Sequence, residues 1–190
     1  MASDPQRVVA LALELAPDVA GTIAELVQPG ASGDFDVLAW AARPEPRPLG
    51  DGPVVLLDHP RHLGNVGAAI RVAAAAGAGG VLVRGVVDPW HAAAVRGAAG
   101  LQFALPVERV DGPPGDRPLI GFDPTGGSPA DIPDNAVLGF GSERHGLSAQ
   151  LRKRADALVA IPMRPGVSSL NLATAVSAAL YGLLIGRGRS

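Results

Sequence analysis

A chain of 190 residues with 47% hydrophobic residues is long enough to enclose a hydrophobic core, and the absence of cysteine excludes a disulfide framework and thiolate metal sites. The net charge of −2 excludes a uniformly basic nucleic-acid-binding protein, but the charge is unevenly divided. Residues 1–60 contain nine acids and three bases (net −6), whereas residues 61–190 contain nine acids and thirteen bases (net +4). A local basic patch in the second part is therefore still compatible with binding to phosphates.

Residues 1–53 are predicted to form an acidic, helical N-terminal extension that ends in a proline-rich linker. Pro5 and Pro17 suit the first turns of two short helices. The prolines of residues 43–53 disfavour both helix and strand pairing. We therefore place the border with the main domain, residues 54–190, at the end of this linker.

The sequence predicts neither a secretory leader nor a membrane span. Residues 1–16 include Asp4 and Glu14 and lack a basic start followed by an apolar run. Residues 165–186 contain no charged residue, but their Ser, Thr and Asn side chains favour a helix buried in a soluble fold. We expect a cytoplasmic protein without membrane attachment.

From residue 54 onward, short apolar runs alternate with segments of helical pattern. The uninterrupted apolar run at residues 54–57 is typical of a strand covered on both faces. The alternation predicts an α/β fold in which a mainly parallel sheet is sandwiched by helices. Strands are expected at residues 54–58, 81–84, 103–106, 118–122, 136–141 and 158–161, and helices at residues 66–77, 90–98, 149–155 and 169–185.

The first segment with chemical content is residues 59–71, at the carboxyl end of the first core strand, where open α/β sheets bind ligands. Gly64 and Gly67 would let the backbone approach a ligand or a neighbouring strand. The segment lacks the third glycine of a dinucleotide-binding motif and the Gly-Lys-Ser/Thr of a P-loop. Glycines in such a turn are more often structural than functional.

Arg71 is the most informative residue of this segment. It is the only charged residue between Arg61 and Arg84, and the residues three and four positions away are Gly or Ala. This pattern predicts that Arg71 projects from a mostly buried helix and must meet an anion, either Glu143 or an RNA phosphate. An arginine that reaches nearby water along its own stem is the alternative.

The second segment, residues 138–148, is a buried strand that runs into a glycine-rich loop. Gly141 lacks a side chain where an adenosyl group could press against the main chain. Glu143 is the only acid between Asp134 and Asp156, at the end of a strand where functional loops are common. Alone, this Gly-Ser-Glu turn is a weak signal.

The third segment, residues 161–171, leads into a helix without charge. The polar residues of this helix recur at three- and four-residue spacing and form one ridge; they are Asn171, Thr174, Ser177 and Tyr181. The remaining faces are apolar. Either core packing or self-association is expected to cover them.

Four basic residues of the second part of the chain are clustered, whereas the histidines are spread along the chain. Arg144, Arg152, Lys153 and Arg154 follow one another with no acid between them, which fits either a phosphate-binding patch or a solvated helix face. None of the four histidines is accompanied by acids or cysteines at ligand spacing, so no metal site is expected.

Taken together, the three segments resemble the motifs of SpoU/TrmH-type RNA methyltransferases of the SPOUT superfamily. Residues 65–71 are similar to the family's Asn-x-Gly-x-x-x-Arg, residues 141–147 to its Gly-Ser-Glu-x-x-Gly-Leu, and residues 161–171 to its Ile-Pro-Met…Ser-Leu-Asn. The resemblance covers about residues 54–185. It implies an S-adenosyl-L-methionine (SAM)-dependent enzyme that methylates a ribose 2′-hydroxyl of tRNA or rRNA, a C-terminal deep trefoil knot, and a homodimer.

The resemblance also implies roles for individual residues. The matching catalytic positions are Asn65, Arg71, Glu143, Ser169 and Asn171. SAM would contact Phe140, Gly141, Ile161, Met163 and Leu170. The basic residues, rather than the resemblance, suggest where RNA would bind; they are Arg61, Arg144, Arg152, Lys153 and Arg154.

For Arg71 we expect stabilisation of the developing alkoxide and of an adjacent phosphate, because guanidinium keeps its proton up to a pH above about 12. Two other functions are compatible with an α/β chain of this kind. One is a catalytically inactive RNA-binding protein of the same fold, which the intact motif residues disfavour. The other is a nucleotide-dependent oxidoreductase, which the absence of the glycine pattern disfavours.

Overall fold

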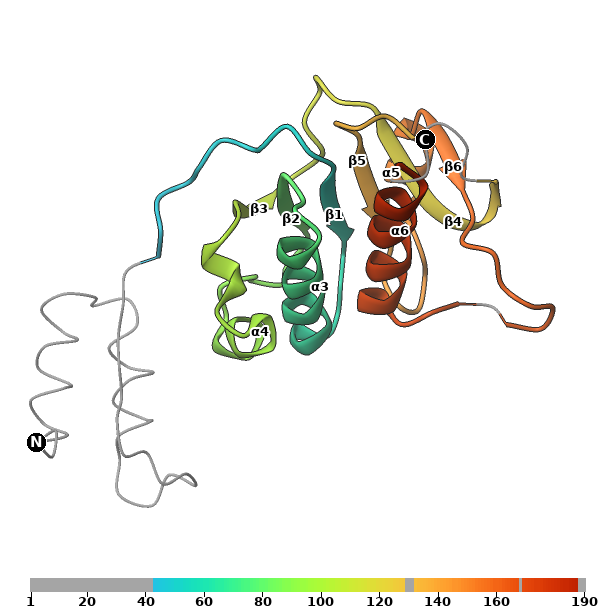
Figure 1. Cartoon of the computed structure of the whole chain (residues 1–190). Coiled ribbons are helices and arrows are strands. Elements are labelled where there is room, and N and C mark those ends of the chain that lie inside the picture. The colour runs from blue at the N-terminus through green and yellow to red at the C-terminus, as the bar shows by residue number, and fades with distance from the viewer. Residues whose placement is uncertain (1–42, 129–131, 168, 188–190) are drawn as a thin grey trace, which may run out of the picture. The chain divides into compact units, whose positions relative to one another are not determined.

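The computed structural model describes residues 43–128, 132–167 and 169–187. Its centre is a six-stranded parallel sheet with the strand order β3-β2-β1-β5-β4-β6 (Figure 1). The strands are β1 (Val54–Asp58), β2 (Gly80–Arg84), β3 (Val107–Val110), β4 (Leu119–Gly127), β5 (Val137–Phe140) and β6 (Ala157–Val159). The helices are α3 (Leu63–Ala75), α4 (Ala92–Ala98), α5 (Ala149–Arg154) and α6 (Leu172–Arg187), with a 3-10 turn, η1, at Leu101–Phe103. The helices expected before residue 43 lie outside the described residues.

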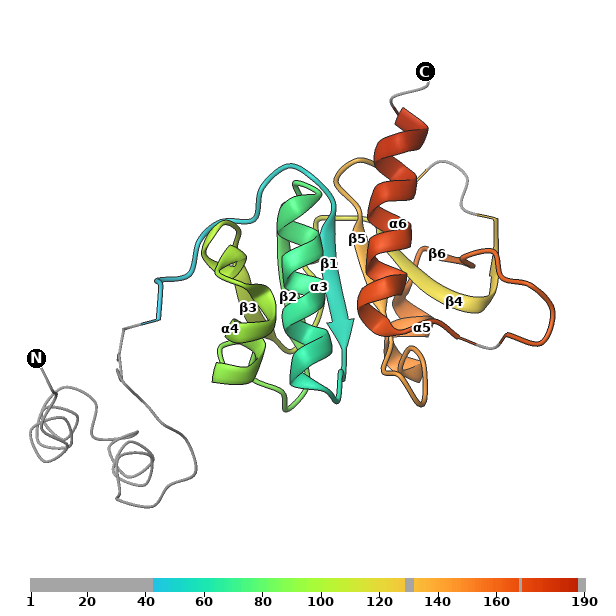
Figure 2. The same cartoon turned by 60° about the horizontal axis from the view of Figure 1, so that its bottom comes forward.

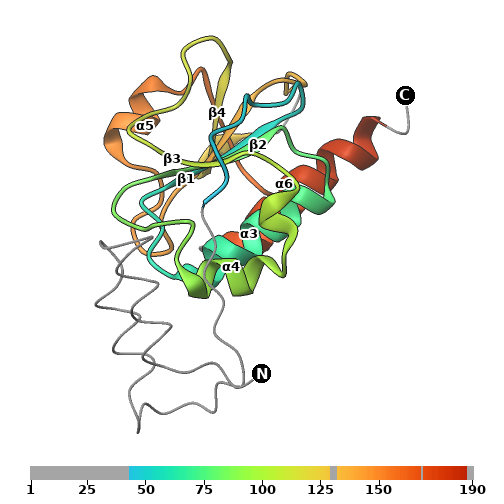
Figure 3. The same cartoon turned by 90° about the vertical axis from the view of Figure 1, so that its left-hand side faces the viewer.

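Strand β1 shows why the sheet must be covered on both faces. All five of its residues are buried, and successive side chains point to opposite faces of a strand. Val55 and Leu57 join the larger core cluster, which lies under α3, α4 and α6. Val54 and Leu56 join a smaller cluster with Leu151 of α5. The predicted parallel sheet between helices is confirmed, with three helices on one face and α5 on the other (Figure 3).

Helices α3 and α6 run side by side over the middle of the sheet (Figures 1 and 2). Helix α4 packs so closely on α3 that a Cβ atom at Gly67 would lie 2.2 Å from the Ala94 carbonyl oxygen. Gly67 is thus required by helix–helix contact, which confirms the structural reading of this glycine; the neighbour that approaches its backbone is a helix, not a ligand or a strand. Gly64 has no atom within 4 Å of its would-be Cβ among the described residues.

The largest error in the predicted elements is β3. The strand expected at residues 103–106 begins at Val107, because the chain first makes two left-handed residues, Ala99 and Gly100, and then the turn η1. Within η1 the polar residue is buried and the aromatic one is exposed, the reverse of what polarity alone would predict. Gln102 is buried and donates to the Pro89 carbonyl at 2.8 Å, whereas Phe103 is 53% exposed. An apolar run was therefore mistaken for a strand.

The linker at residues 43–53 contains neither helix nor strand, as expected. Its end is fixed to the sheet domain, because the Gly50 N–H donates to the Gly79 carbonyl at 2.8 Å and the Gly79 N–H to the Pro53 carbonyl at 2.9 Å. Arg117 also donates to the carbonyl of Gly50, at 2.7 Å. Where the border with the N-terminal extension falls stays a prediction.

Helix α6 is buried along only one side. Leu172, Val176 and Leu180 belong to the large core, whereas Tyr181 and Ile185 are exposed, Ile185 by 61%. Core packing thus accounts for one apolar face and leaves the other open. None of the described helices combines the length and apolarity that crossing a membrane would require.

Candidate functional site

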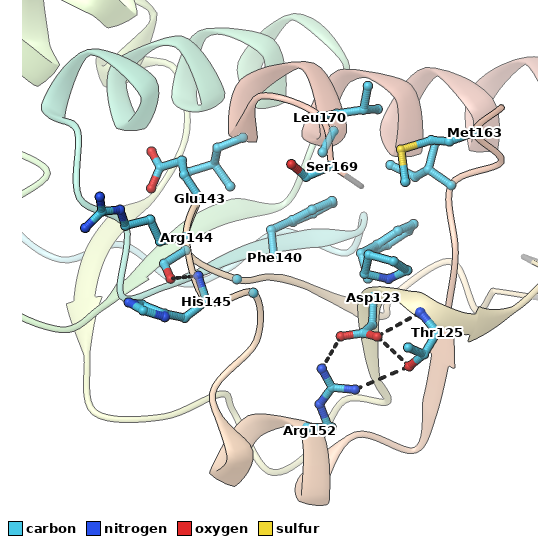
Figure 4. A pocket seen from close by; sticks show the side chains of 18 residues that line it. Asp123, Thr125, Phe140, Glu143, Arg144, His145, Arg152, Met163, Ser169 and Leu170 are labelled. Carbon is cyan, nitrogen blue, oxygen red and sulfur yellow. Dashed lines mark hydrogen bonds and ion pairs between the residues drawn. The ribbon is translucent and has the colours of Figure 1, made fainter. Parts of the chain in front are cut away.

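A cavity lies at the end of β5 and beside residues 122–125 of β4, between these strands and the segment that leads into α6 (Figure 4). Its volume of about 380 Å³ is within the range of small-molecule sites. The cavity is lined by Phe122, Asp123, Pro124, Thr125, Phe140, Gly141, Ser142, Glu143, Arg144, His145, Gly146, Arg152, Ile161, Met163, Ser169, Leu170, Leu172 and Ala175. All five residues that the resemblance assigned to the cofactor are among them.

The middle of the cavity is apolar. The rings of Phe122 and Phe140 are stacked, with centroids 4.7 Å apart and planes inclined by 7°. Met163 and Leu170 line the other side of the space, on the segment before α6 (Figure 4). This arrangement offers a flat or aliphatic group burial between aromatic and aliphatic side chains.

Gly141 is required by the protein's own backbone. A Cβ atom there would lie 1.8 Å from the carbonyl carbon of Gly146. The loop folds back at this point through a pair of hydrogen bonds, from the Ser142 N–H to the Gly146 carbonyl (3.0 Å) and from the Gly146 N–H to the Ser142 carbonyl (2.9 Å). Gly146 itself adopts a left-handed conformation, with φ 65°. The fold thus accounts for this glycine whether or not a ligand lies against it.

Glu143, Asn65 and Asn171 form a chain of hydrogen bonds that joins all three motif segments. The Asn65 amide donates to Glu143 Oε1 at 2.8 Å, and the Asn171 amide donates to Asn65 Oδ1 at 3.0 Å. Asn171 Oδ1 also accepts the Ala173 N–H at 2.9 Å, so the same side chain caps α6. Residues separated by more than a hundred positions are thereby fixed to one another.

The Glu143 carboxylate is held in its ionised form. Burial alone would raise the pKa of Glu143, but hydrogen bonds from the Asn65 amide and from the backbone N–H groups of Glu143 itself and Arg61, with the charge of His62, lower it below its usual value. Glu143 therefore acts as an acceptor that orients Asn65.

Arg71 is exposed and makes no hydrogen bond or ion pair with any residue that the structure describes. Glu143, one of the two anions expected to meet Arg71, is therefore not its partner in this structure, and the side chain reaches water as the alternative reading had it; an RNA phosphate as its partner stays a prediction. On α3, Arg71 shares the exposed side with Gly64 and Ala75, and the small residues three and four positions from Arg71 made this side look buried. The guanidinium is free to meet a ligand or a second chain.

The five basic residues assigned to RNA lie in different surroundings. Arg61, Arg144 and Lys153 are exposed, and Arg144 also lines the cavity. Arg154 donates to the Pro113 carbonyl at 3.2 Å. Arg152 instead forms an ion pair with Asp123 in the cavity wall (Figure 4). A continuous run of bases in the sequence thus divides between surface and cavity.

Asp123 is a site residue that sequence reasoning missed. Its carboxylate accepts the Thr125 N–H (2.9 Å) and hydroxyl (2.6 Å) on Oδ1, and Arg152 on Oδ2. Burial would raise the pKa of Asp123, but the hydrogen bonds from Thr125 and the Arg152 guanidinium lower it. The available signal was Asp-x-Thr directly after the apolar residues Leu119–Phe122 of β4, at the same sheet edge as Glu143.

A second missed network surrounds Asp58, which is 1% exposed at the end of β1. It accepts Arg84 Nη1 (2.8 Å), His59 Nδ1 (2.8 Å) and the Ser148 N–H (2.7 Å). Burial would raise the pKa of Asp58, but these hydrogen bonds lower it. Neither Asp58 nor Arg84 lines the cavity, so this network holds the far end of the 141–148 loop without facing the site.

No three His, Asp or Glu side chains come together in metal-binding geometry within the part of the chain that the structure describes. The expected absence of a metal stays a prediction.

The chain matches the SpoU rRNA Methylase family over residues 52–181. It is 37% identical over 144 residues to the 23S rRNA (uridine(2479)-2'-O)-methyltransferase of Streptomyces viridochromogenes, covering 67% of this chain and 50% of the relative. It is 34% identical over 146 residues to the 23S rRNA (adenosine(1067)-2'-O)-methyltransferase of Streptomyces laurentii, covering 68% and 53%. The crystal structure of the SpoU methyltransferase AviRb from Streptomyces viridochromogenes in complex with AdoMet superposes with a TM-score of 0.67 at 35% identity, covering 74% of this chain and 59% of that one.

The chain therefore belongs to the SpoU rRNA Methylase family, as the resemblance of its three segments indicated. Its sheet and helices match those of the solved SpoU methyltransferase. This membership gives no support to the oxidoreductase reading. The chain spans about half the length of the curated relatives it matches.

Proposed function

We propose that this protein transfers a methyl group from SAM to a ribose 2′-hydroxyl of RNA. The observation that carries the proposal is the joining of Glu143, Asn65 and Asn171, one from each motif segment, beside a cavity of cofactor size. Two relatives named as 23S rRNA 2'-O-methyltransferases support rRNA over tRNA as the substrate class. Family membership does not favour the inactive RNA-binding alternative, and we do not adopt it.

The cavity fits SAM in both its apolar and its polar parts. Phe140, Met163 and Leu170 offer burial to an adenine ring, and Ile161 adds to the same apolar wall. Gly141 and Ser142 bring backbone groups to the surface of the cavity. When bound, SAM supplies a methyl group that is already activated by its sulfonium.

The chain's own residues then have to orient the two reacting groups and exclude water. Glu143 holds Asn65, and the first turn of α6 holds Asn171. Because both amides are already oriented, little conformational entropy is lost when RNA binds. Ser169 lines the cavity next to this chain of hydrogen bonds. Arg71 supplies a positive charge that stabilises the oxygen as it loses its proton, together with a neighbouring phosphate.

We further propose a homodimer in which the open face of α6 is buried. Leu170, Tyr181, Leu184 and Ile185 are exposed on or beside this helix, and a second copy would remove them from water. In such a dimer, the exposed Arg71 of one chain could contribute to an active site formed by both chains. By family resemblance we expect the segments around β6 and α6 to form a deep trefoil knot, and we expect the enzyme to act on RNA in the cytoplasm.

Methyl transfer can be tested with tritiated SAM and RNA from a strain that lacks this protein. We expect tritium in the RNA, and after alkaline hydrolysis we expect it in dinucleotides, because cleavage requires a free 2′-hydroxyl. Label in mononucleotides would show base methylation and contradict the ribose assignment. Tight RNA binding without transfer would favour the inactive alternative.

A further inference from the structure

Arg152 and Asp123 form one wall of the cavity, away from Glu143 (Figure 4). Arg152 lies on the short helix α5, whose first turn is capped by the Ser148 hydroxyl. Asp123 lies on β4, so the ion pair also joins two elements that flank the cavity. Neither residue belongs to the three motif segments.

The two partners differ in what they can still bind. Asp123 is 2% exposed in its side chain, and its carboxylate already accepts two hydrogen bonds from Thr125 and one from Arg152. Arg152 is 41% exposed in its side chain and uses its two terminal nitrogens toward Asp123 and Thr125. A guanidinium has five N–H donors, so donors remain for a ligand. The pair therefore offers the cavity a fixed cation.

We propose that Arg152 binds the carboxylate of the amino-acid portion of the methyl donor. The inference rests on the proposed function, since it concerns the same cavity. The carboxylate is the one anionic group of SAM, and an arginine held by a buried aspartate presents it with a pre-oriented pair of donors. Arg152 is thus a specificity residue for the cofactor, where the sequence pattern had assigned it to RNA.

Arg144 also lines the cavity but is a weaker candidate. It is exposed, and it makes no hydrogen bond or ion pair with the residues described here. Its side chain would have to be ordered when the ligand binds, whereas Arg152 is already held by Asp123, which Thr125 fixes in turn. A mobile surface cation suits an RNA phosphate better.

The test compares two ligands that differ only beyond the adenosine. S-adenosylhomocysteine carries the amino-acid portion, and 5′-methylthioadenosine lacks it. Calorimetry should show that Arg152→Met weakens S-adenosylhomocysteine binding by about 10- to 100-fold, the loss expected for one charged hydrogen-bonded contact. Binding of 5′-methylthioadenosine should stay within about twofold of wild type, which a general distortion of the cavity would not allow.

Three further variants sharpen the measurement. Asp123→Asn should weaken S-adenosylhomocysteine binding in the same selective way but less, because the neutral amide holds Arg152 less firmly. Arg96→Met removes an exposed arginine of α4 and should bind both ligands like wild type. Arg144→Met should still bind S-adenosylhomocysteine more tightly than 5′-methylthioadenosine, as wild type does.

The opposite outcomes overturn the inference. If Arg152→Met weakens the binding of both ligands equally, the residue shapes the cavity and does not bind the carboxylate. If the variant binds the cofactor like wild type but binds RNA more weakly, Arg152 contacts RNA instead. If only Arg144→Met loses the preference for S-adenosylhomocysteine over 5′-methylthioadenosine, the carboxylate binds at Arg144 and not at Arg152. If wild type binds neither SAM nor S-adenosylhomocysteine, the proposed function itself fails, and this inference fails with it.

Discussion

Two regions at the carboxyl edge of the same sheet hold networks of charged side chains, and the regions differ in where the hydrogen bonds of these networks go. The Asp58 network at β1 and β2 is closed: Arg84 donates to Asp58, to the Asp111 carbonyl and to Ser148, all within the protein. The networks at β4 and β5 are open, because Glu143 and Arg152 line the cavity as well as binding their neighbours.

The difference separates residues that hold the site from residues that meet a ligand. A buried ion pair whose partners bind only other groups of the protein fixes geometry, and removing one partner leaves an uncompensated charge. An ion pair with donors to spare can take part in binding. Changes in the closed network should therefore alter stability, and changes in the open ones should alter affinity or turnover.

The largest expected effect is on stability, from Asp58→Asn. The substitution leaves the Arg84 guanidinium buried without its carboxylate, so the free energy of unfolding should fall by about 3–5 kcal/mol. Urea denaturation measures it. Near-wild-type stability would show that Asp58 does not anchor this edge, and a loss of S-adenosylhomocysteine affinity at full stability would erase the distinction between the closed and the open networks.

Gly141→Ala should come next. The added Cβ would meet the backbone of Gly146 and Leu147, which cannot move away like a flexible side chain, and we expect a loss of about 3 kcal/mol. Gly64→Ala is the matched control, since its Cβ would meet no described atom within 4 Å. Thermal denaturation of both variants checks this. Equal effects would refute the role assigned to the folded-back loop.

Arg71→Lys should reduce turnover about 100-fold while S-adenosylhomocysteine affinity stays near wild type, because lysine cannot reproduce the planar pair of donors. Tritium transfer under saturating SAM measures the rate. Arg96→Lys, on the exposed side of α4, is the control. Turnover above half that of wild type in Arg71→Lys would remove this residue from the reaction.

The smallest expected effect is the loss of stability at acid pH that is due to protonation of the Asp58 carboxylate. The pKa of Asp58 is lowered in the folded state, so its stabilisation is fully present above the unfolded value near 4 and is lost as the pH falls through the folded value. Wild type should therefore lose more stability than Asp58→Asn between about pH 5 and pH 3, with both followed by urea denaturation. Parallel curves would contradict the lowered pKa.

The sequence predicted the fold well where a sequence pattern is compatible with only one structure. Val54–Leu57 had to be a central strand, because an uninterrupted apolar run needs cover on both faces. The strand expected at residues 103–106 failed because Phe103 is apolar but exposed, beside Trp90 and not in the core. Hydrophobicity alone could not reveal the left-handed turn before it.

The candidate site was predicted unevenly for similar reasons. Asn65, Glu143 and Asn171 came from motif order, and the structure brings them into hydrogen-bond contact. Asp123 and Arg152 meet only through the folding of β4 against α5, which no local pattern records. Arg71 was expected on a mostly buried helix face, but small neighbours can mean either a packed face or an exposed one, and here the face is exposed.

The most direct test of the account is a crystal structure of the protein with S-adenosylhomocysteine. We predict that the adenosine lies between Phe140 and Leu170, that the carboxylate meets Arg152, and that the sulfur faces the side where Glu143 holds Asn65. Ligand bound elsewhere on the protein, with the cavity between β5 and α6 filled only by water, would contradict the central claim.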